Sequence, residues 1–459
     1  MKGFKKFLIP TLGAVAAVSL ASCGISHTGE PNNGVTKNED GTFTVRVGNT
    51  NAAALLPTVF GPMDYGAKAY AYYFGESQNE GKVKMEYILR DDGYNATVRA
   101  TNTAQLLNED KVFGIVYSYA DQANALEEAN KPEIYTPLTM DYYQESGDSV
   151  ASFPIQPIDY VEGQQLLASA FAKGEAGLGA KKVGVIAGLG STGVDELAGM
   201  RAELKKLGKT ENTDFFVQTI ANDASSDYAS CVAALKANGV DVLLLTDVTF
   251  LSVVAAIVAS NWENLTVLAS YKFSNALYFS GAYTAGILNN GRKLLTTGWI
   301  AAGVQNAETY DEWAEYVHAL TAYAKSRGDA LTNKDIEEAA PEVVAELQEK
   351  YEWAADGVSP YYYDSYAMAG YIGTYVFGEG ISRLYKDGLL EGASTEDYVA
   401  EMEKGGMHIP MSTIEVSLKD GARTGARAMT LVNCTEANHT LGEPFRTFYD
   451  IPALEKAAK

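Results

Sequence analysis

Acidic and hydroxyl side chains stand where several apolar runs of the sequence end. Asp92 closes the run KMEYILRDD, Ser118 closes VFGIVYS, and Asp247 closes VDVLLLTD. Runs of this composition are typical of buried strands. A carboxylate can bind an ammonium group and a hydroxyl can hold a carboxylate, and small-molecule sites place a few such groups in an apolar cleft. The spacing therefore predicts a binding site for a small polar molecule.

The side-chain patterns that enzymes use are absent. The sequence has no G-x-S-x-G elbow, and none of its four histidines lies beside a nucleophile in a strand-end loop. Asp91 and Asp92 are neighbours on an expected strand, so their side chains point to opposite faces and cannot form an acid–base pair. Asp92 is instead expected to cap the helix that follows. We expect no catalytic residue and no enzymatic activity.

Cofactor and metal signatures are equally weak. Gly188, Gly190 and Gly193 match the G-x-G-x-x-G dinucleotide pattern, but the acid that should follow about 20 residues later is displaced to Asp223. We interpret the glycines as a tight strand-to-helix turn whose backbone amides can face a ligand. The three cysteines form no C-x-x-C pair and there is no H-E-x-x-H, so we expect no metal and no cofactor.

Composition narrows the partners. The 459 residues are 47% hydrophobic and 20% charged, which is enough for packed cores. Lys and Arg number 36 against 58 Asp and Glu, giving a net charge of -22. So acidic a surface repels phosphate backbones and anionic lipid headgroups, which excludes nucleic acid as a partner.

The first residues form a targeting segment. Three lysines within the first six residues precede an apolar stretch at 7–20, which is typical of a secretory signal peptide over 1–22. The tetrad Leu20-Ala21-Ser22-Cys23 resembles the lipobox of bacterial lipoproteins. That resemblance implies cleavage before Cys23 and lipidation of its thiol. Residues 23–41 then form the lipidated end and a flexible, polar tether. We expect an extracytoplasmic protein anchored to a bacterial membrane.

Beyond residue 42 the chain alternates strands and helices, which indicates parallel βαβ units. The segment 85–119 is echoed by 216–250: each has a strand, an acid, a helix and a second apolar strand. The echo predicts two similar α/β lobes, with the strands ending at Ser118 and Asp247 in equivalent places. Ligands bind beyond the carboxyl ends of such strands. A mostly helical, acidic insertion is expected at 307–357.

Several segments resemble one family. They are RVGNTNAAALL, YGAKAYAYYF, YILRDDGYNATVRATNTAQLL-x4-VFGIVYSY, YTPLT, GVIAG-x4-GVDELAGM, DSYAMAGYIG and HIPMSTIEVSLKDGARTGARAMTLV. In this order the sequence resembles the type 1 periplasmic-binding-protein fold, in the Leu/Ile/Val-binding branch of ABC-transporter solute-binding proteins. The resemblance implies a Venus-flytrap of two doubly wound parallel-sheet lobes joined by a three-stranded hinge. It also implies a monomer that delivers a ligand to an ABC permease; a sensing receptor lipoprotein is the alternative.

The resemblance and the strand pattern together divide the chain. Lobe 1 is expected to contain 42–154 and 304–408, and lobe 2 to contain 161–298 and 414–459. The hinge crossings are expected near 155–160, 299–303 and 409–413.

The same two sources give the candidate ligand residues. The family's way of holding an amino-acid carboxylate implies, for lobe 1, Ser118, Tyr119, Ala120, Asp121, Leu138, Thr139 and Met140. The strand ends of lobe 2 add Ser191, Thr192, Asp247, Tyr271 and Phe273.

Charge predicts the ligand class. None of the segments 117–121, 138–141, 190–193 and 246–249 contains Arg or Lys, and a dianion usually needs a cationic clamp. Lys272 adjoins the site, but strand alternation predicts that it points away from Tyr271. We expect a neutral or zwitterionic ligand: first an amino acid, apolar or aromatic, and second an amide, urea-like or nucleobase-like compound.

Three roles are left with alternatives. Asp247 is predicted to bind the ligand ammonium, against N-capping of the helix that begins near Phe250. Tyr117 and Tyr119 are predicted to narrow the pocket, against packing at the lobe edge. Cys231 is favoured as a buried free thiol over a disulfide with Cys434.

Overall fold

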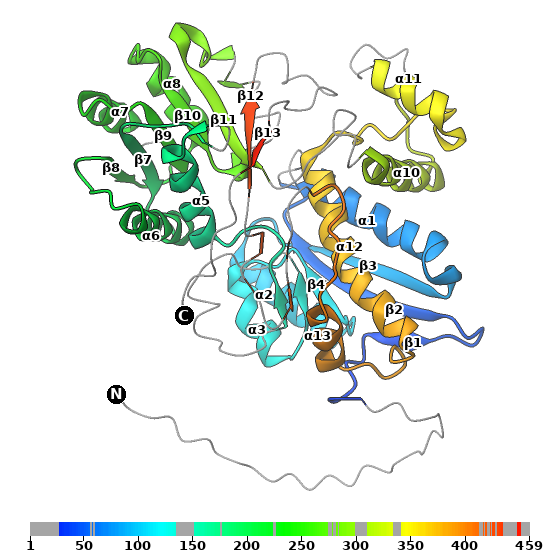
Figure 1. The fold of residues 1–459 in the computed structure, drawn as a ribbon. Coiled ribbons are helices and arrows are strands. Elements are labelled where there is room, and N and C mark those ends of the chain that lie inside the picture. The colour runs from blue at the N-terminus through cyan, green and yellow to red at the C-terminus, as the bar shows by residue number, and fades with distance from the viewer. Residues whose placement is uncertain are drawn as a thin grey trace, which may run out of the picture.

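The computed structural model describes residues 27–55, 57, 60–134, 151–174, 177–223, 226–273, 278, 281–282, 284–298, 310–333, 341–412, 416, 418–419, 423, 425–426, 429–434 and 448–450. Cys23 and the segment 138–140 lie outside them. Within these residues the chain forms two α/β lobes side by side (Figure 1), as the sequence predicts.

The first lobe is built on a mostly parallel sheet ordered β3-β2-β4-β5-β6, with β1 antiparallel to β2. Its strands are β1 (Val35–Lys37), β2 (Phe43–Asn51), β3 (Val83–Asp91), β4 (Gly114–Val116), β5 (Glu133–Ile134) and β6 (Ser152–Phe153). Successive residues of β4 serve opposite faces. Ile115 packs with Leu106 and Leu126, whereas Val116 joins the main core.

Helices cover both faces of this sheet. The helices are α1 (Phe60–Ser77), α2 (Ala96–Asn108), α3 (Ala123–Glu128), α12 (Ser365–Lys386) and α13 (Thr395–Glu403). The side chain of Asn95 caps α2 through the amides of Thr97 and Val98, so the expectation that Asp92 is the cap is wrong. Asp92 lies one turn too early, and its carboxylate instead accepts from the Tyr94 amide.

The second lobe repeats the order, as β8-β7-β9-β10-β11, and adds β12 and β13 antiparallel at the edge. Its strands are β7 (Val183–Gly188), β8 (Phe215–Ile220), β9 (Val242–Thr246), β10 (Thr266–Ala269), β11 (Lys293–Gly298), β12 (Thr430–Cys434) and β13 (Phe448–Asp450). Its helices are α5 (Asp159–Phe171), α6 (Ser191–Lys206), α7 (Tyr228–Ala237) and α8 (Phe250–Ala259). Val185 faces the core under α5 and α6, and Ile186 faces the core under α7 and α8.

The chain passes between the sheets after β6. Phe153 and Ile155 belong to the main core, which continues to Leu166 of α5. Helix α5 then packs closely on α6, and Gly163 allows this because it has no side chain. A Cβ at this position would collide with the carbonyl oxygen of Glu196. Residues 409–412, part of an expected crossing of the three-stranded hinge, lie outside any strand.

The described part of the insertion is mostly helical, as predicted. It contains α10 (Tyr310–Arg327), α11 (Pro341–Lys350) and the 3-10 turn η6 (Glu352–Ala354). Short 3-10 turns also form at η1 (Asn79–Gly81), η2 (Ala120–Gln122), η4 (Tyr271–Phe273) and η5 (Asn289–Gly291).

Two further findings concern a cysteine and the lengths of the helices. Cys231 is a buried free thiol, which confirms that interpretation, and burial raises its pKa. In the described part of the chain no helix is both long and apolar enough to cross a membrane.

Candidate ligand-binding site

Each sheet reverses its strand order at one point, between β2 and β4 in the first lobe and between β7 and β9 in the second. Ligands of open α/β sheets bind at the carboxyl ends of strands beside such a point. Tyr117 directly follows β4 and Asp247 directly follows β9, so the two strand ends are equivalent, as the sequence echo predicts. Both residues have left-handed backbones, with φ of 60° and 48°. Such strain in residues other than glycine is concentrated at functional sites.

The side chains after β4 divide between core and surface. The hydroxyl of Tyr117 donates to the carbonyl oxygens of Ala369 and Gly370 on α12, so this ring is buried in the core and does not narrow a pocket. Ser118 is also buried, and its hydroxyl donates to the Glu133 carboxylate over 2.6 Å. Of the expected pair, Tyr117 is buried and Tyr119 is only partly buried.

A cation that sequence analysis missed organises this region. Arg99 of α2 pairs with Asp92 over 2.8 Å and with Asp121 over 2.7 Å, and its guanidinium carbon lies 3.7 Å from the centre of the Tyr119 ring. Desolvation opposes the charge, but hydrogen bonds to Asp121 and Asp92 hold the pKa of Arg99 above its ordinary value. The structure thereby brings Tyr119 and Asp121 together around one guanidinium.

Tyr119 belongs to a group of three neighbouring aromatic rings. Its ring lies 6.4 Å from that of Phe60 and 6.3 Å from that of Tyr94, centre to centre. Burial, and then Asp92, raise the pKa of Tyr119 well above its ordinary value. Its buried hydroxyl has no hydrogen-bond partner among the residues that the structure describes. Ala120 opens η2 directly after it.

The end of β2 contributes polar atoms that the sequence analysis did not select. The side-chain oxygen of Thr50 and the side-chain nitrogen of Asn51 are buried and lack partners within the described part of the chain. Buried polar atoms are nearly always satisfied, so unpaired ones at a switch point indicate a place for ligand or water. The signal was present in the sequence, because polar GNTN closes an otherwise apolar strand.

In the second lobe Asp247 lies against the glycine turn after β7. A Cβ on Gly190 would come 2.7 Å from Oδ2 of Asp247, and Oδ1 accepts from the amide nitrogen of Asn222 over 3.1 Å. Asp247 does not cap α8, whose N-cap is Thr249. Ser191, exposed, and Thr192 begin α6, which has no side-chain cap. The glycines thus form the tight turn that we predicted.

A buried ionic cluster underlies the remaining loop of this lobe. The Lys272 ammonium lies 2.7 Å from Asp159, 3.2 Å from Glu162 and 2.5 Å from Glu196. These three carboxylates are essentially inaccessible to solvent. Burial raises the pKa of Asp159 and of Glu196, while Lys272 opposes the rise. Burial disfavours the ammonium too, but the carboxylates hold the pKa of Lys272 well above its ordinary value.

The position of Lys272 corrects an expectation. Residues 271–273 form the 3-10 turn η4, so strand alternation does not apply, and the ammonium lies 5.6 Å from the centre of the Tyr271 ring. The Tyr271 amide donates to Thr297 and Glu162, and Thr192 lowers the pKa of Asp159. The cluster therefore links Thr192 and Tyr271. Phe273 stands apart, because it stacks on Phe250 at 5.1 Å in the second core.

Comparisons with known proteins agree with this architecture. A sequence family described as "Periplasmic binding protein" matches residues 52–439. A leucine binding protein from Thermotoga maritima superposes with a TM-score of 0.59 at 14% identity, covering 85% of this chain and 96% of that one. No curated protein matches the sequence.

Two further structures were solved with ligands. A branched chain amino acid ABC transporter protein from Thermus thermophilus, with bound valine, gives a TM-score of 0.62 at 14% identity and covers 91% and 97% of the two chains. A solute binding protein from Rhodopseudomonas palustris, in complex with 3,4-dihydroxy benzoic acid, gives 0.60 at 17% identity and covers 89% and 97%. At these identities the likeness shows the fold, and it confirms the type 1 architecture.

Proposed function

The chain belongs to the periplasmic binding protein family, and we propose that it is a solute-binding lipoprotein that captures an amino acid between its lobes and delivers it to an ABC permease. Family membership supports extracytoplasmic ligand binding rather than catalysis. The lipid anchor at Cys23, the permease and the ligand are parts of the proposal.

The negative charge of Asp247 is the main reason for proposing an amino acid as the ligand. Its half-buried carboxylate hydrogen-bonds to a neutral amide, Asn222, and has no cationic partner in the described part of the chain. A partly buried carboxylate gains from a charged partner, and a ligand ammonium supplies one. Asp247 also lies where the second sheet reverses, at the position equivalent to Tyr117.

The nearby cations favour a zwitterion over a dianion. Arg99 is held by two carboxylates and Lys272 by three, so neither is free to clamp a second negative charge. Backbone amides at the start of α6, together with hydroxyls, can hold a single carboxylate. The neighbouring rings of Tyr119, Phe60 and Tyr94 favour a ligand with an apolar or aromatic side chain. An amide, urea-like or nucleobase-like compound is the second candidate, because it needs no ion pair.

Capture requires the lobes to close. The proposed hinge crossings are 155–160, 299–303 and 409–413, and closure of this kind is a common switching mode. Small-angle scattering with saturating ligand should show a smaller radius of gyration than without it. An unchanged radius would rule out closure.

Calorimetry on the chain lacking residues 1–23 tests the ligand. Amino acids are screened against the wild type, Asp247→Ala and the control Glu263→Ala, an exposed acid of the same lobe. Loss of a buried ion-pair partner costs about 3–5 kcal/mol. We expect Asp247→Ala to lose that affinity and Glu263→Ala to keep it. The amino-acid assignment is wrong if no amino acid binds, or if Asp247→Ala binds as the wild type does.

A further inference from the structure

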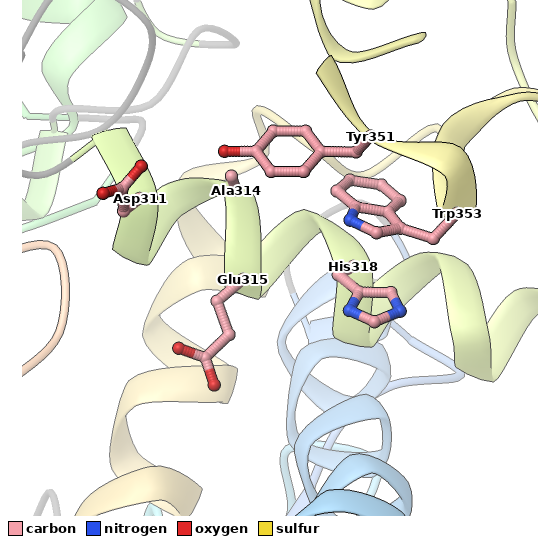
Figure 2. Close-up of a pocket in the computed structure, with 6 residues that line it drawn as sticks. All are labelled: Asp311, Ala314, Glu315, His318, Tyr351 and Trp353. Atoms are coloured by element: carbon pink, nitrogen blue, oxygen red, sulfur yellow. The ribbon is translucent and has the colours of Figure 1, made fainter.

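The helical insertion of the first lobe contains a hollow of about 290 Å³, separate from the strand ends described above (Figure 2). One stripe of α10 lines one side of it, since its four residues recur at the spacing of a helical face. The segment after α11 brings two aromatic rings over that stripe. The lining residues are Asp311, Ala314, Glu315, His318, Tyr351 and Trp353.

The aromatic side of the hollow is a column of stacked rings. Trp353 stacks on Tyr351 with ring centres 5.3 Å apart and on His318 at 4.8 Å. His318 also meets the edge-on ring of Tyr73 at 5.4 Å. Partial burial, and then Lys325, lower the pKa of His318, which disfavours the charged imidazolium. The column therefore adds aromatic surface to one side of the hollow, and its surroundings disfavour a positive charge on His318.

Two carboxylates on the α10 stripe carry uncompensated charge. Asp311 and Glu315 are one helical turn apart, and neither has an ion-pair or hydrogen-bond partner among the described residues. Glu312 between them is already engaged, because it accepts from His408 and from the Met411 amide. Partial burial, and then Glu312, raise the pKa of Glu315, as expected for a carboxylate that lacks a cation.

Two lysines of the insertion have partners other than this pair. Lys350 binds Glu346 over 2.6 Å and lies over the Tyr310 ring at 4.1 Å. Lys325 donates to the carbonyl oxygen of Trp353 over 2.9 Å. The contact of Lys350 with Tyr310 is a cation–π interaction within the same insertion.

We propose that this hollow is a second binding site, for a small organic cation bearing an alkylammonium or guanidinium group. Ring faces attract such cations within about 6 Å, and the two carboxylates add a direct charge interaction. The volume of about 290 Å³ lies at the lower limit of ligand pockets, so it admits a head group and not a large molecule. The cation is either a free amine or the side chain of a partner protein's Lys or Arg.

The test uses the purified full-length protein and the NMR signal of the Trp353 indole N–H, assigned with Trp353→Phe. The probes are tetramethylammonium, methylguanidinium and the neutral control neopentyl alcohol. We expect saturable shifts with both cations, and at least tenfold weaker binding of the alcohol. Asp311→Asn combined with Glu315→Gln should weaken cation binding at least tenfold. Glu349→Gln, an exposed acid of α11, should leave it unchanged.

A glycine-flanked arginine peptide separates the two sources. Tighter binding of the peptide than of methylguanidinium indicates a partner protein, and equal binding indicates a free cation. The proposal is overturned if no cation gives a saturable shift, if neopentyl alcohol binds as tightly, or if the double variant binds as the wild type does. None of these readouts depends on the ligand held between the lobes.

Discussion

The guanidinium carbon of Arg99 lies over the Tyr119 ring, 3.7 Å from its centre, and the same group ion-pairs with Asp121. Helix α2 and the turn after β4 are thus joined by one side chain at the carboxyl end of the first sheet. Asp92, which is buried, binds the Nε of the same guanidinium. Lobe 1 therefore presents an aromatic ring whose cationic neighbour is already neutralised.

Freeing that cation should change the ligand preference. In Asp121→Asn, Arg99 keeps Asp92 but loses its second carboxylate, so its outer edge can bind an anion. We expect affinity for 4-hydroxybenzoate to rise at least tenfold, about 1.4 kcal/mol, in calorimetry. Glu128→Gln, an exposed acid on α3, serves as the control. Equal affinities in Asp121→Asn and wild type would show that Arg99 does not face the ligand.

The Lys272 cluster should control stability and its pH dependence. In Lys272→Met three buried carboxylates lose their cation, which costs about 3–5 kcal/mol at pH 8. Acids whose folded-state pKa is raised, such as Asp159 and Glu196, penalise folding increasingly as pH rises above their unfolded values. The deficit should therefore shrink as pH falls to 5.

Urea unfolding of this variant at pH 8 and pH 5 measures the effect. Lys206→Met, which removes an exposed lysine beside Glu203, is the matched control and should change little. A deficit equal at both pH values, or one no larger than that of the control, would contradict the assigned role of the cluster.

Gly190 should matter to binding through Asp247. A Cβ at this position would lie 2.7 Å from Oδ2 of Asp247, so Gly190→Ala must displace the carboxylate. We expect amino-acid affinity to fall at least tenfold in calorimetry. Gly61→Ala, whose new Cβ meets nothing within 4 Å, should bind normally. Unchanged affinity in Gly190→Ala would show that Asp247 does not bind the ligand.

Lipidation predicts a simple biochemical phenotype. Cys23→Ser removes the thiol that the lipobox resemblance assigns to acylation, so the protein should lose palmitate label and leave the membrane fraction. Cys231→Ser, which replaces a buried free thiol, should keep both properties. Membrane retention of Cys23→Ser with undiminished label would refute the anchor.

The fold could be predicted from the sequence because its strands and helices follow local hydrophobic periodicity. Apolar runs alternating with helical segments predicted two parallel sheets, and the echo between 85–119 and 216–250 predicted the equivalence of β4 and β9. Irregular segments were less accessible: residues 409–412 were expected in a hinge strand but lie outside any strand.

The site was harder to predict because its cationic side chains are distant in the sequence from the residues they bind. Arg99 lies on a helix, outside the strand-end segments, and Lys272 meets Asp159 across 113 positions of sequence. Strand alternation also failed at Lys272, because the chain enters the 3-10 turn η4 one residue after β10 ends. Tyr117 was predicted to narrow the pocket. Its backbone is left-handed, however, and its ring is buried against α12. Such placements depend on tertiary packing, which no local pattern encodes.

The most direct test compares the tightest-binding amino acid with its analogue lacking the α-amino group, by calorimetry on wild type and Asp247→Asn. If Asp247 holds the ammonium, the wild type should prefer the amino acid by at least a hundredfold, about 2.7 kcal/mol. Asp247→Asn should bind the two compounds with similar affinity. A wild type that does not discriminate, or a variant that discriminates equally well, would contradict the account.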